Sequence, residues 1–203
     1  NILNPLEIIA NYGIDELRYY LMKEVSHGSD GSVSLKSLEN CVNSDLANNY
    51  GNLCRRVFSF IKNNCNGFVR KSISKSVSEK KLISKTKKLI SNLRNEMDNQ
   101  NLNNYIKAVL DISFLTNKFI NDEEPWRLKK TNVNKMNNIL YLALEQIATI
   151  SILLNPIIPI ATTKVLKALN INEKSRNFSL LNKKNILNKK AKVKDLEILF
   201  KKI

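Results

Sequence analysis

Apolar residues recur at helical spacing along most of this chain, in stretches separated by short polar breaks. Positions three and four apart share one face of an α-helix, so this pattern predicts amphipathic helices. It predicts a long helix carrying residues 46–61, further helices over 79–98, 101–121 and 134–154, and a last one ending near Ala168. Long helices joined by short breaks are typical of a helical bundle, and we expect a mainly α fold.

Each predicted helix has an apolar face that we expect to line the core. In the first helix this face contains Leu46, Leu53, Val57 and Phe60, with Ile61 at its margin. In the helix over 79–98 the face contains Leu82, Leu89, Ile90, Leu93 and Met97. In the helix over 101–121 it contains Tyr105, Ile106, Val109, Ile112, Leu115, Phe119 and Ile120. The helix over 134–154 is the most apolar, which predicts a place at the centre of the bundle.

The first 35 residues have a different pattern. Pro5 starts a short helix that Gly13 ends, and a second helix follows directly. The apolar face of this second helix is expected to contain Ile14, Leu17, Tyr20 and Leu21. A turn at His27–Gly31 leads to the β-prone residues 32–34. We therefore expect a strand that completes a small mixed α/β module before Ser34 caps the next helix.

The end of the chain is polar and basic. Residues 170–194 are lysine-rich and weakly periodic, so we expect a tail that runs over the surface. The apolar residues 196–200 are expected to dock on the bundle. These patterns divide the chain into a module over 1–35, a helix bundle over 36–169 and a tail over 170–203. Because the start lacks both a methionine and a signal peptide, we expect a piece of a longer protein.

The composition is strongly basic. The 203 residues carry a formal net charge of +15, from 33 Lys and Arg against 18 Asp and Glu. This charge suits a polyanionic partner, because each cation set against a phosphate releases counterions. Lysine and asparagine are abundant in every part of the chain, however, so a merely solvated surface is an equal alternative.

The sequence argues against several kinds of site. Three cysteines without a C-x-x-C pair and one histidine predict neither a disulfide framework nor a zinc site. The apolar stretch 139–161 is interrupted by polar residues and prolines, which indicates a buried helix rather than a membrane span. Motifs for nucleotide binding or nucleophilic catalysis are absent from the sequence. We expect no metal, no membrane contact and no catalytic site in this chain, and a cytoplasmic location.

Two polar side chains on the first long helix can read a nucleobase. Asn52 and Arg56 are four residues apart, so they project from neighbouring turns at the flank of the apolar face. An amide offers a donor and an acceptor, and a guanidinium offers a planar fork of donors. Together they can hydrogen-bond the edge of an exposed base. The alternative is that Arg56 is a solvated cation and Asn52 a bystander.

The single tryptophan is a candidate stacking platform. Trp126 follows Pro125, which favours a helix start and would place the indole at the mouth of a helix. The acidic run Asp122–Glu124 is then expected at a helix N-terminus, where it suits the helix dipole. Burial in the core is the alternative for so large an aromatic residue. The cations suited to contacts with an RNA backbone are Arg55, Arg127, Lys129 and Lys130.

The chain contains, in order, the segments Asn1–Pro5, Tyr12–Leu21, Asn43–Arg56, Asn117–Ile120 and Pro125–Lys130. These segments resemble the carboxy-terminal half of the bacterial methionyl-tRNA synthetases, a class I family. The Tyr-Gly-x-Asp-x-Leu-Arg element is shared with other class I synthetases. A second element is more specific to the methionine enzymes. It is the run Asp-Leu-Ala-Asn, Gly-Asn-Leu and Arg within Asp45–Arg56, together with Pro125–Trp126. The last five residues resemble the family's Leu-Phe-Pro-Arg-Ile ending, with two lysines in place of Pro-Arg.

The resemblance implies a stem-contact module over 1–35 and the anticodon-binding helix bundle of class I aminoacyl-tRNA synthetases over 36–169. It implies that Asn52 and Arg56 contact the first anticodon base, that Trp126 stacks on it, and that the partner is tRNA(Met) with a CAU anticodon. The whole protein would be an ATP-dependent methionine–tRNA ligase that works through methionyl-adenylate. ATP, with Mg, and methionine would bind a catalytic domain of the same polypeptide, beyond a signature loop upstream.

Two alternatives stay open. The corresponding domain of an isoleucine, valine, leucine or cysteine synthetase would share the first module. A non-catalytic helical interaction module with a solvated basic face would need no RNA. A change of the first anticodon base separates the sister synthetases, and RNA binding at low salt tests the interaction module.

Overall fold

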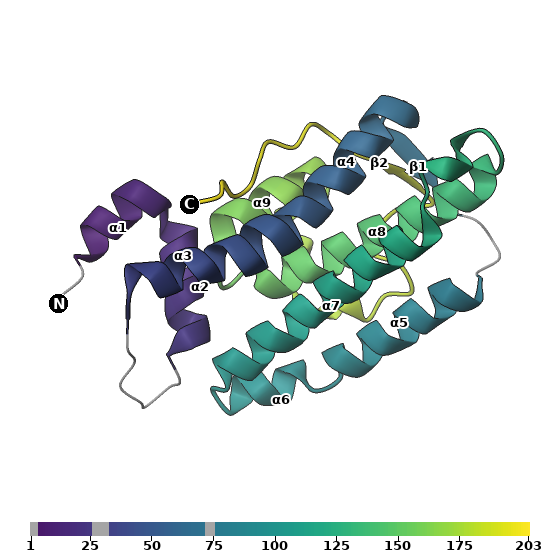
Figure 1. Cartoon of the computed structure of the whole chain (residues 1–203). Helices are drawn as coiled ribbons and strands as arrows, with labels where there is room; N and C mark the ends of the chain where they lie inside the picture. The colour runs from purple at the N-terminus through teal and green to yellow at the C-terminus, as the bar shows by residue number, and fades with distance from the viewer. Residues whose placement is uncertain (1–3, 26–32, 72–75) are drawn as a thin grey trace.

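The computed structural model describes residues 4–25, 33–71 and 76–203. Regular structure in these ranges is mostly helical, which confirms the predicted mainly α fold (Figure 1). The elements are α1 (Pro5–Tyr12), α2 (Ile14–Glu24), α3 (Leu35–Cys41), η1 (Val42–Gly51), α4 (Asn52–Asn64), β1 (Phe68–Arg70), α5 (Val77–Ile90), α6 (Leu93–Asp98), α7 (Leu102–Glu123), η2 (Arg127–Lys129), α8 (Val133–Leu154), α9 (Pro159–Ala168), η3 (Glu173–Ser175), α10 (Phe178–Leu181) and β2 (Lys190–Lys192). Of the η elements, η1 is a π-helix, and η2 and η3 are single 3-10 turns.

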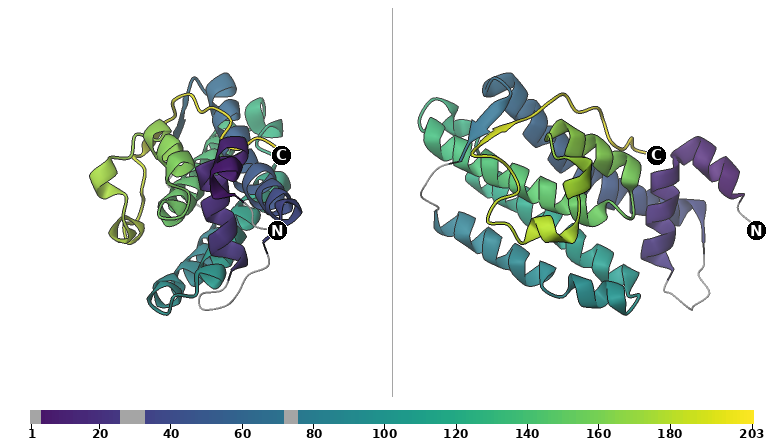
Figure 2. Two further views of the ribbon diagram at one scale, coloured as in Figure 1. Left: turned by 90° about the vertical axis from the view of Figure 1, so that its left-hand side faces the viewer. Right: turned by 180° about the vertical axis from the view of Figure 1, so that it is seen from behind.

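The helices form an elongated bundle. α7 packs along α8, α5 and α6 cover the outer side of α7, and α4 and α9 pack on α8 (Figures 1 and 2). The helices α1 and α2 lie at one end of the bundle, and the β1–β2 ribbon lies at the other. The two ends of the molecule are therefore built from different parts of the chain.

The helix α8 is the centre of the core, as predicted. Every residue from Ile139 to Leu154 except Glu145 is buried. By length and composition alone α8 is also able to span a membrane, but 78% of its apolar window is buried inside the bundle. This is the environment of a core helix.

The short N-terminal helices begin and end as the sequence predicts. The Asn4 side chain caps α1 by accepting a hydrogen bond from the Leu6 backbone N–H at 3.0 Å. The helix ends at Gly13, whose φ of 111° is a conformation that favours glycine. Ser34 caps α3 by accepting from the Ser37 backbone N–H at 3.1 Å.

The apolar face of α2 differs from the predicted one. Leu17 and Tyr20 are buried, but Ile14 and Leu21 are 43% and 41% exposed. Tyr19, outside the predicted face, is fully buried. Its hydroxyl donates to a carboxylate of η1, and this hydrogen bond allows the polar tip of the ring to enter the core.

The mixed α/β character predicted for the first module is wrong in the described residues. Val33 and Ser34 belong to no strand, while Ser32 and the predicted turn His27–Gly31 lie outside the described residues. Residues 4–25 and 33–41 consist of α1, α2 and α3 with their connections. A short β-prone segment needs a partner strand, and the described part of this module offers none.

The first long helix is a continuous run from Leu35 to Asn64, made of α3, η1 and α4. Its middle ten residues form a π-helix, a rare conformation with wider turns. Buried side-chain hydrogen bonds hold this segment in place. Tyr50 OH lies 2.7 Å from Ser151 Oγ, and Ser113 Oγ donates to Asn49 Oδ1 at 2.8 Å. The sequence periodicity predicts a helix here but not its type.

The core face of this helix is shifted slightly from the prediction. The residues Leu46, Leu53 and Val57 are buried as predicted. Ile61, predicted at the margin, is fully buried, whereas Phe60 is only partly buried. Cys54 and Phe58 also face the core, so its centre lies away from Phe60.

Gly51, the last residue of η1, permits a close approach of the backbone to its surroundings. A Cβ here would lie 2.9 Å from the Leu46 carbonyl oxygen and 3.4 Å from Phe200 Cδ2. We expect Gly51→Ala to destabilise the fold, because overpacking costs about 1–3 kcal/mol. Over most of this range the cost exceeds the gain of about 1 kcal/mol that alanine usually has over glycine in a helix. Urea denaturation measures the change, with the exposed Ser59→Ala as the control; an unchanged midpoint for Gly51→Ala would contradict the expectation.

The helix predicted over 79–98 is two helices, α5 and α6. They are separated at Ser91 and Asn92. Ser91 Oγ donates to the Lys88 carbonyl at 2.8 Å, and Asn92 Nδ2 donates to Glu96 Oε1 at 2.6 Å. Such local side-chain hydrogen bonds compete with the helical backbone pattern. The next two helices, α7 and α8, match the predicted ranges closely.

The tail is more structured than the predicted surface segment. β2 pairs antiparallel with β1, with Val69 opposite Ala191. The buried apolar residues after α9 are Leu169, Ile171, Leu180, Leu187, Ala191, Val193 and Phe200. The predicted docking of the apolar end is confirmed at Phe200, and the Ile203 backbone N–H donates to Asn43 Oδ1 at 3.0 Å. The tail thus runs from β2 back to the end that carries α1 and α2 (Figure 2).

Candidate nucleic-acid interface

The helix α4 carries the predicted pair Asn52 and Arg56 on adjacent turns. Leu53 and Val57 of the same helix face the core, and Asn52 and Arg56 are half-buried beside them. The Asn52 amide has no hydrogen-bond partner among the described residues. Its donors and acceptor are therefore available to a ligand.

Two further side chains, Asn121 and Trp126, contact Arg56 of this pair. Arg56 Nη2 donates to Asn121 Oδ1 at 2.8 Å, and the guanidinium carbon of Arg56 lies 5.6 Å from the centroid of the Trp126 ring. The second distance is that of a cation–π contact. The structure therefore brings two predicted site residues together. Asn121 was missed, because the sequence gives no signal for a contact across 65 positions.

Trp126 lies on a turn at the surface. α7 is capped by Glu124, whose φ is 43°, and the buried Pro125 follows. A single 3-10 turn begins directly after Trp126, where a helix start was predicted. The indole is 41% exposed, so the core alternative for this residue is wrong. An exposed indole is suited to stacking a base, and that role remains a prediction.

The four cations predicted for backbone contacts lie on α4 and in the segment that follows Trp126. Arg127 Nη1 lies 3.0 Å from Glu124 Oε2, and Lys129 Nζ donates to a side-chain amide of α4 at 2.9 Å. Arg55 and Lys130 are exposed and have no partner in the described ranges. Exposed ion pairs contribute little, so all four cations are able to exchange their present surroundings for a phosphate.

The acidic run Asp122–Glu124 lies at a helix C-terminus, not at the predicted N-terminus. It occupies the last turn and cap of α7, where the helix dipole disfavours negative charge. Local partners compensate: Glu123 Oε2 lies 2.9 Å from Lys135 Nζ. Burial acts to raise the pKa of Glu123, but a hydrogen bond from Ser78 and the Lys135 ammonium together lower it. The run therefore fixes the α7–α8 connection that presents Trp126.

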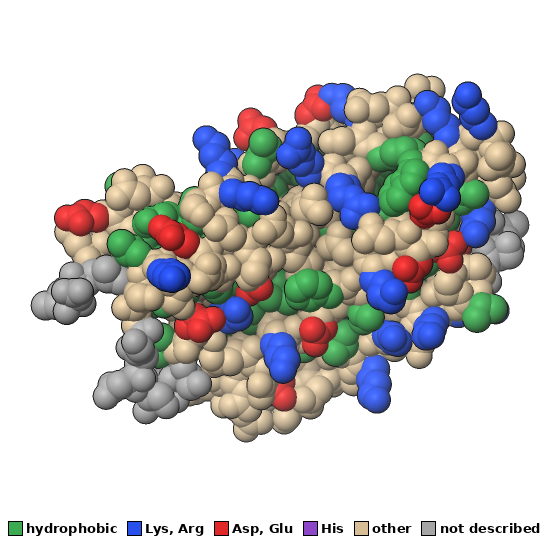
Figure 3. Space-filling view, viewed as in Figure 1, with side chains coloured by type: hydrophobic (Ala, Val, Ile, Leu, Met, Phe, Trp, Pro, Cys, Tyr) green, Lys and Arg blue, Asp and Glu red, His purple; other side chains and the backbone are tan. Residues whose placement is uncertain are grey.

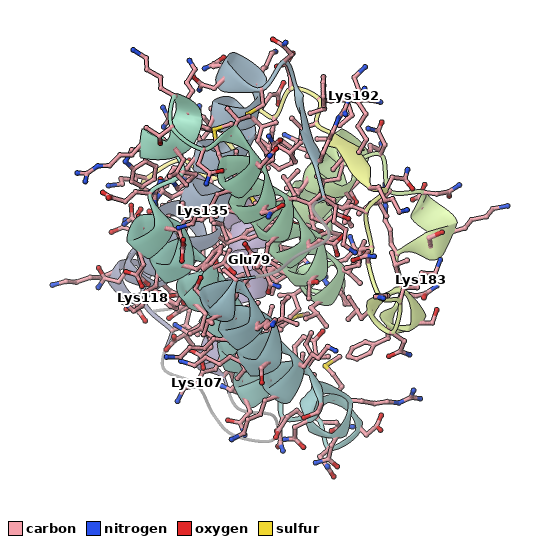
Figure 4. All side chains as sticks on the ribbon, turned by 90° about the vertical axis from the view of Figure 1, so that its right-hand side faces the viewer. Glu79, Lys107, Lys118, Lys135, Lys183 and Lys192 are labelled. Atoms are coloured by element: carbon pink, nitrogen blue, oxygen red, sulfur yellow. The ribbon has the colours of Figure 1, made fainter. Side chains whose placement is uncertain are left out.

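The positive charge is spread over the surface. On the face in Figure 3, Lys and Arg side chains lie over the whole length of the molecule, with acidic side chains between them. Another side shows the same spread, including Lys107, Lys118 and Lys135 (Figure 4). No single basic patch dominates these faces, so the positions of the cations must carry any argument about RNA.

A buried polar cluster joins α2, α3 and η1. Asp45 Oδ2 lies 2.7 Å from Lys23 Nζ and accepts from Tyr19 OH at 2.9 Å. Burial raises the pKa of the neighbouring Cys41 thiol to about 12 although Lys23 acts to lower it. A nucleophilic cysteine needs a lowered pKa, so this cluster is structural. In the described ranges no three His, Cys, Asp or Glu side chains come together as a metal site would require.

Two family models match the chain. Residues 69–203 match the anticodon binding domain of methionyl tRNA ligase, and residues 1–58 match the class I tRNA synthetases of the methionine type. The chain is 35% identical to the methionine–tRNA ligase of Brucella suis, over 88% of this chain and 35% of that protein. It is 31% identical to the enzyme of Rickettsia conorii, over 100% of this chain and 40% of that protein. The chain thus spans well under half the length of these relatives.

Solved structures give the same result. The methionyl-tRNA synthetase of Mycobacterium tuberculosis bound by methionyl-adenylate is similar over 99% of this chain and 40% of that chain. The TM-score is 0.92 at 26% sequence identity. The free form of that protein matches all of this chain with a TM-score of 0.91.

Proposed function

The chain belongs to the methionine–tRNA ligase family, and on this premise we propose that it selects tRNA by reading the anticodon. The reading residues are Asn52, Arg56 and Trp126. The whole protein would be an ATP-dependent methionine–tRNA ligase that works in the cytoplasm. This chain would supply recognition, while a catalytic domain of the same polypeptide would bind methionine and ATP with Mg. ATP would activate the methionine carboxylate as an adenylate there.

The observation that carries the proposal is the contact of Arg56 with Trp126. One face of α4 presents the guanidinium of Arg56 beside an exposed indole, together with the amide of Asn52, which has no partner among the residues that the structure describes. Asn121 accepts from one nitrogen of Arg56, which holds the guanidinium while its other donors remain available. A base stacked on the indole would place its edge near both polar groups, the arrangement used to read unpaired RNA bases.

The proposed ligand is the CAU anticodon loop of tRNA(Met). Its first base would stack on Trp126 and accept or donate hydrogen bonds at Asn52 and Arg56. The exposed cations Arg55 and Lys130 would contact the backbone on either side. Contacts to phosphates position the RNA, whereas contacts to base edges give the specificity.

Binding of short anticodon hairpins tests this function. We expect the CAU hairpin to bind more tightly than hairpins with another first base, by about 1–3 kcal/mol, the usual value of a base contact. Isothermal titration at fixed salt measures each affinity. Lys189→Ala, in the tail, serves as the control, because it should weaken all hairpins alike. Equal affinity for CAU and unrelated anticodons would contradict base reading.

The same titrations address the two alternatives. The family comparisons name methionine enzymes, which argues against a sister synthetase for isoleucine, valine, leucine or cysteine. An interaction module with a solvated basic face would bind no hairpin even at low salt, where nonspecific phosphate contacts are strongest.

A further inference from the structure

A cavity of about 730 Å³ lies between α5, α8 and the tail around α10. Its size is that of a small-molecule site. None of the proposed anticodon-reading residues lines it. Figure 4 shows this side of the molecule, with Glu79 near the middle of the view and Lys183 on the tail. The cavity is therefore a feature separate from the candidate RNA interface.

A glutamine side chain in the wall of the cavity has a donor that the described residues do not satisfy. Gln146 is only 5% exposed, and its Oε1 accepts from Thr86 Oγ1 at 2.8 Å. Its Nε2 donates to no acceptor among the described residues, and the residue lines the cavity. This nitrogen is not one of the two fully buried polar atoms that lack a partner in the described ranges, Asn49 Nδ2 and Asn117 Oδ1, so it is accessible from the cavity. The Gln146 amide nitrogen therefore offers hydrogen bonds to a molecule in the cavity.

The rest of the lining defines the chemistry of that molecule. Apolar side chains, among them Ile83, Ile90 and Ile186, form part of the walls. Four lysines line the cavity against two carboxylates. One carboxylate, Glu145, is already satisfied: it accepts from the backbone N–H groups of Ile186 and Leu187 at 3.0 and 2.9 Å and from Tyr141 OH at 3.0 Å. The excess of cations favours an anion.

We propose that this cavity binds a small organic anion with an apolar body and a carboxylate. The carboxylate accepts from Gln146 Nε2 and faces the lysines at the rim, Lys87 and Lys183 among them. The apolar body lies against the isoleucines. Burial of that body supplies the affinity, while the hydrogen bond and the charge fix the orientation.

Glutamine-selective 15N labelling of the whole 203-residue chain tests the site directly. The chain has two glutamines, Gln146 and the exposed Gln100 between α6 and α7, so Gln100 is an internal reference. The Gln146 side-chain signals are assigned by their absence from Gln146→Leu. Octanoate is the probe, and 1-octanol and inorganic phosphate lack its charge and its apolar chain respectively.

We expect octanoate to shift the Gln146 side-chain signals saturably and to leave Gln100 unchanged. The affinities for 1-octanol and for phosphate should each be about tenfold lower or worse. Lys87→Gln should weaken octanoate binding about fivefold, whereas Lys88→Gln, the same charge change on the next residue and outside the cavity, should leave it unchanged.

Three outcomes overturn the proposal. The first is that the chemical shifts of the Gln146 side chain do not change at millimolar octanoate. The second is an equal affinity for octanoate and 1-octanol, and the third is an equal effect of Lys87→Gln and Lys88→Gln on octanoate binding. The lysine variants lie on the surface and keep the test valid if Gln146→Leu does not fold. None of these measurements needs RNA binding, so they test the cavity proposal independently of the anticodon proposal.

Discussion

Trp126→Ala is expected to weaken binding of the CAU hairpin by about 1–3 kcal/mol, a loss of about 5- to 150-fold in affinity. The indole is 41% exposed and touches Arg56, so its removal takes away both the stacking surface and the support of the guanidinium. Arg56→Ala should cost a similar amount, because it removes the donors to the base edge. Isothermal titration of each variant with the same hairpin measures the loss.

The double variant sharpens this prediction. Because Arg56 and Trp126 are in contact, their effects should not add, and we expect a coupling of about 0.5–1 kcal/mol. The matched controls are Phe114→Ala and Arg55→Ala. Phe114 is an exposed aromatic residue on α7, and Arg55 is the cation next to Arg56 on α4. Phe114→Ala should leave binding unchanged, and Arg55→Ala should weaken all hairpins alike. A Trp126→Ala variant that binds CAU as tightly as the unchanged chain would refute the stacking role.

Asp45→Ala is expected to cause the largest loss of stability among the substitutions considered. Asp45 is 8% exposed, accepts from the Tyr19 hydroxyl and pairs with Lys23. Its removal takes the acceptor from Tyr19 and leaves Lys23 with the longer contact to Glu24, at 3.3 Å. Breaking a buried pair in this way costs about 3 kcal/mol. The value is at the lower end of the usual range because the Lys23 side chain is 30% exposed. Thermal unfolding should show a fall of roughly 6–12 °C in Tm.

An exposed ion pair supplies the comparison for Asp45. Asp122 lies 3.1 Å from Lys118, and their side chains are 59% and 73% exposed. Asp122→Ala should change the free energy of unfolding by less than about 0.5 kcal/mol. If Asp45→Ala and Asp122→Ala gave the same Tm, the buried cluster would have no special part in stability.

The periodicity of apolar residues predicted the helices that depend mainly on their own sequence. The long helix α7 has one strong apolar face, α8 is apolar around most of its circumference, and the Ser34 cap acts on its own helix. The family resemblance also pointed to Asn52, Arg56 and Trp126, and the structure places Arg56 and Trp126 in contact.

Features that depend on distant contacts were not predictable from one sequence. The β1–β2 ribbon joins segments more than a hundred residues apart, and three-residue strands carry no clear alternation. The contact of Arg56 with Asn121 spans 65 positions. The break between α5 and α6 depends on the local hydrogen bonds of Ser91 and Asn92, which compete with an otherwise unbroken helical pattern.

The π-helix η1 sets the rotational phase of the candidate site. Each residue of an α-helix turns the next by about 100° around the axis. The wider turns of a π-helix rotate each residue by less than this, so deleting one residue from the ten of η1 would swing Asn52 and Arg56 by roughly a quarter turn relative to α1–α3, with their spacing on α4 intact. The direction in which α4 presents its polar face thus depends on how tightly the preceding turns are wound, as much as on which residues it carries.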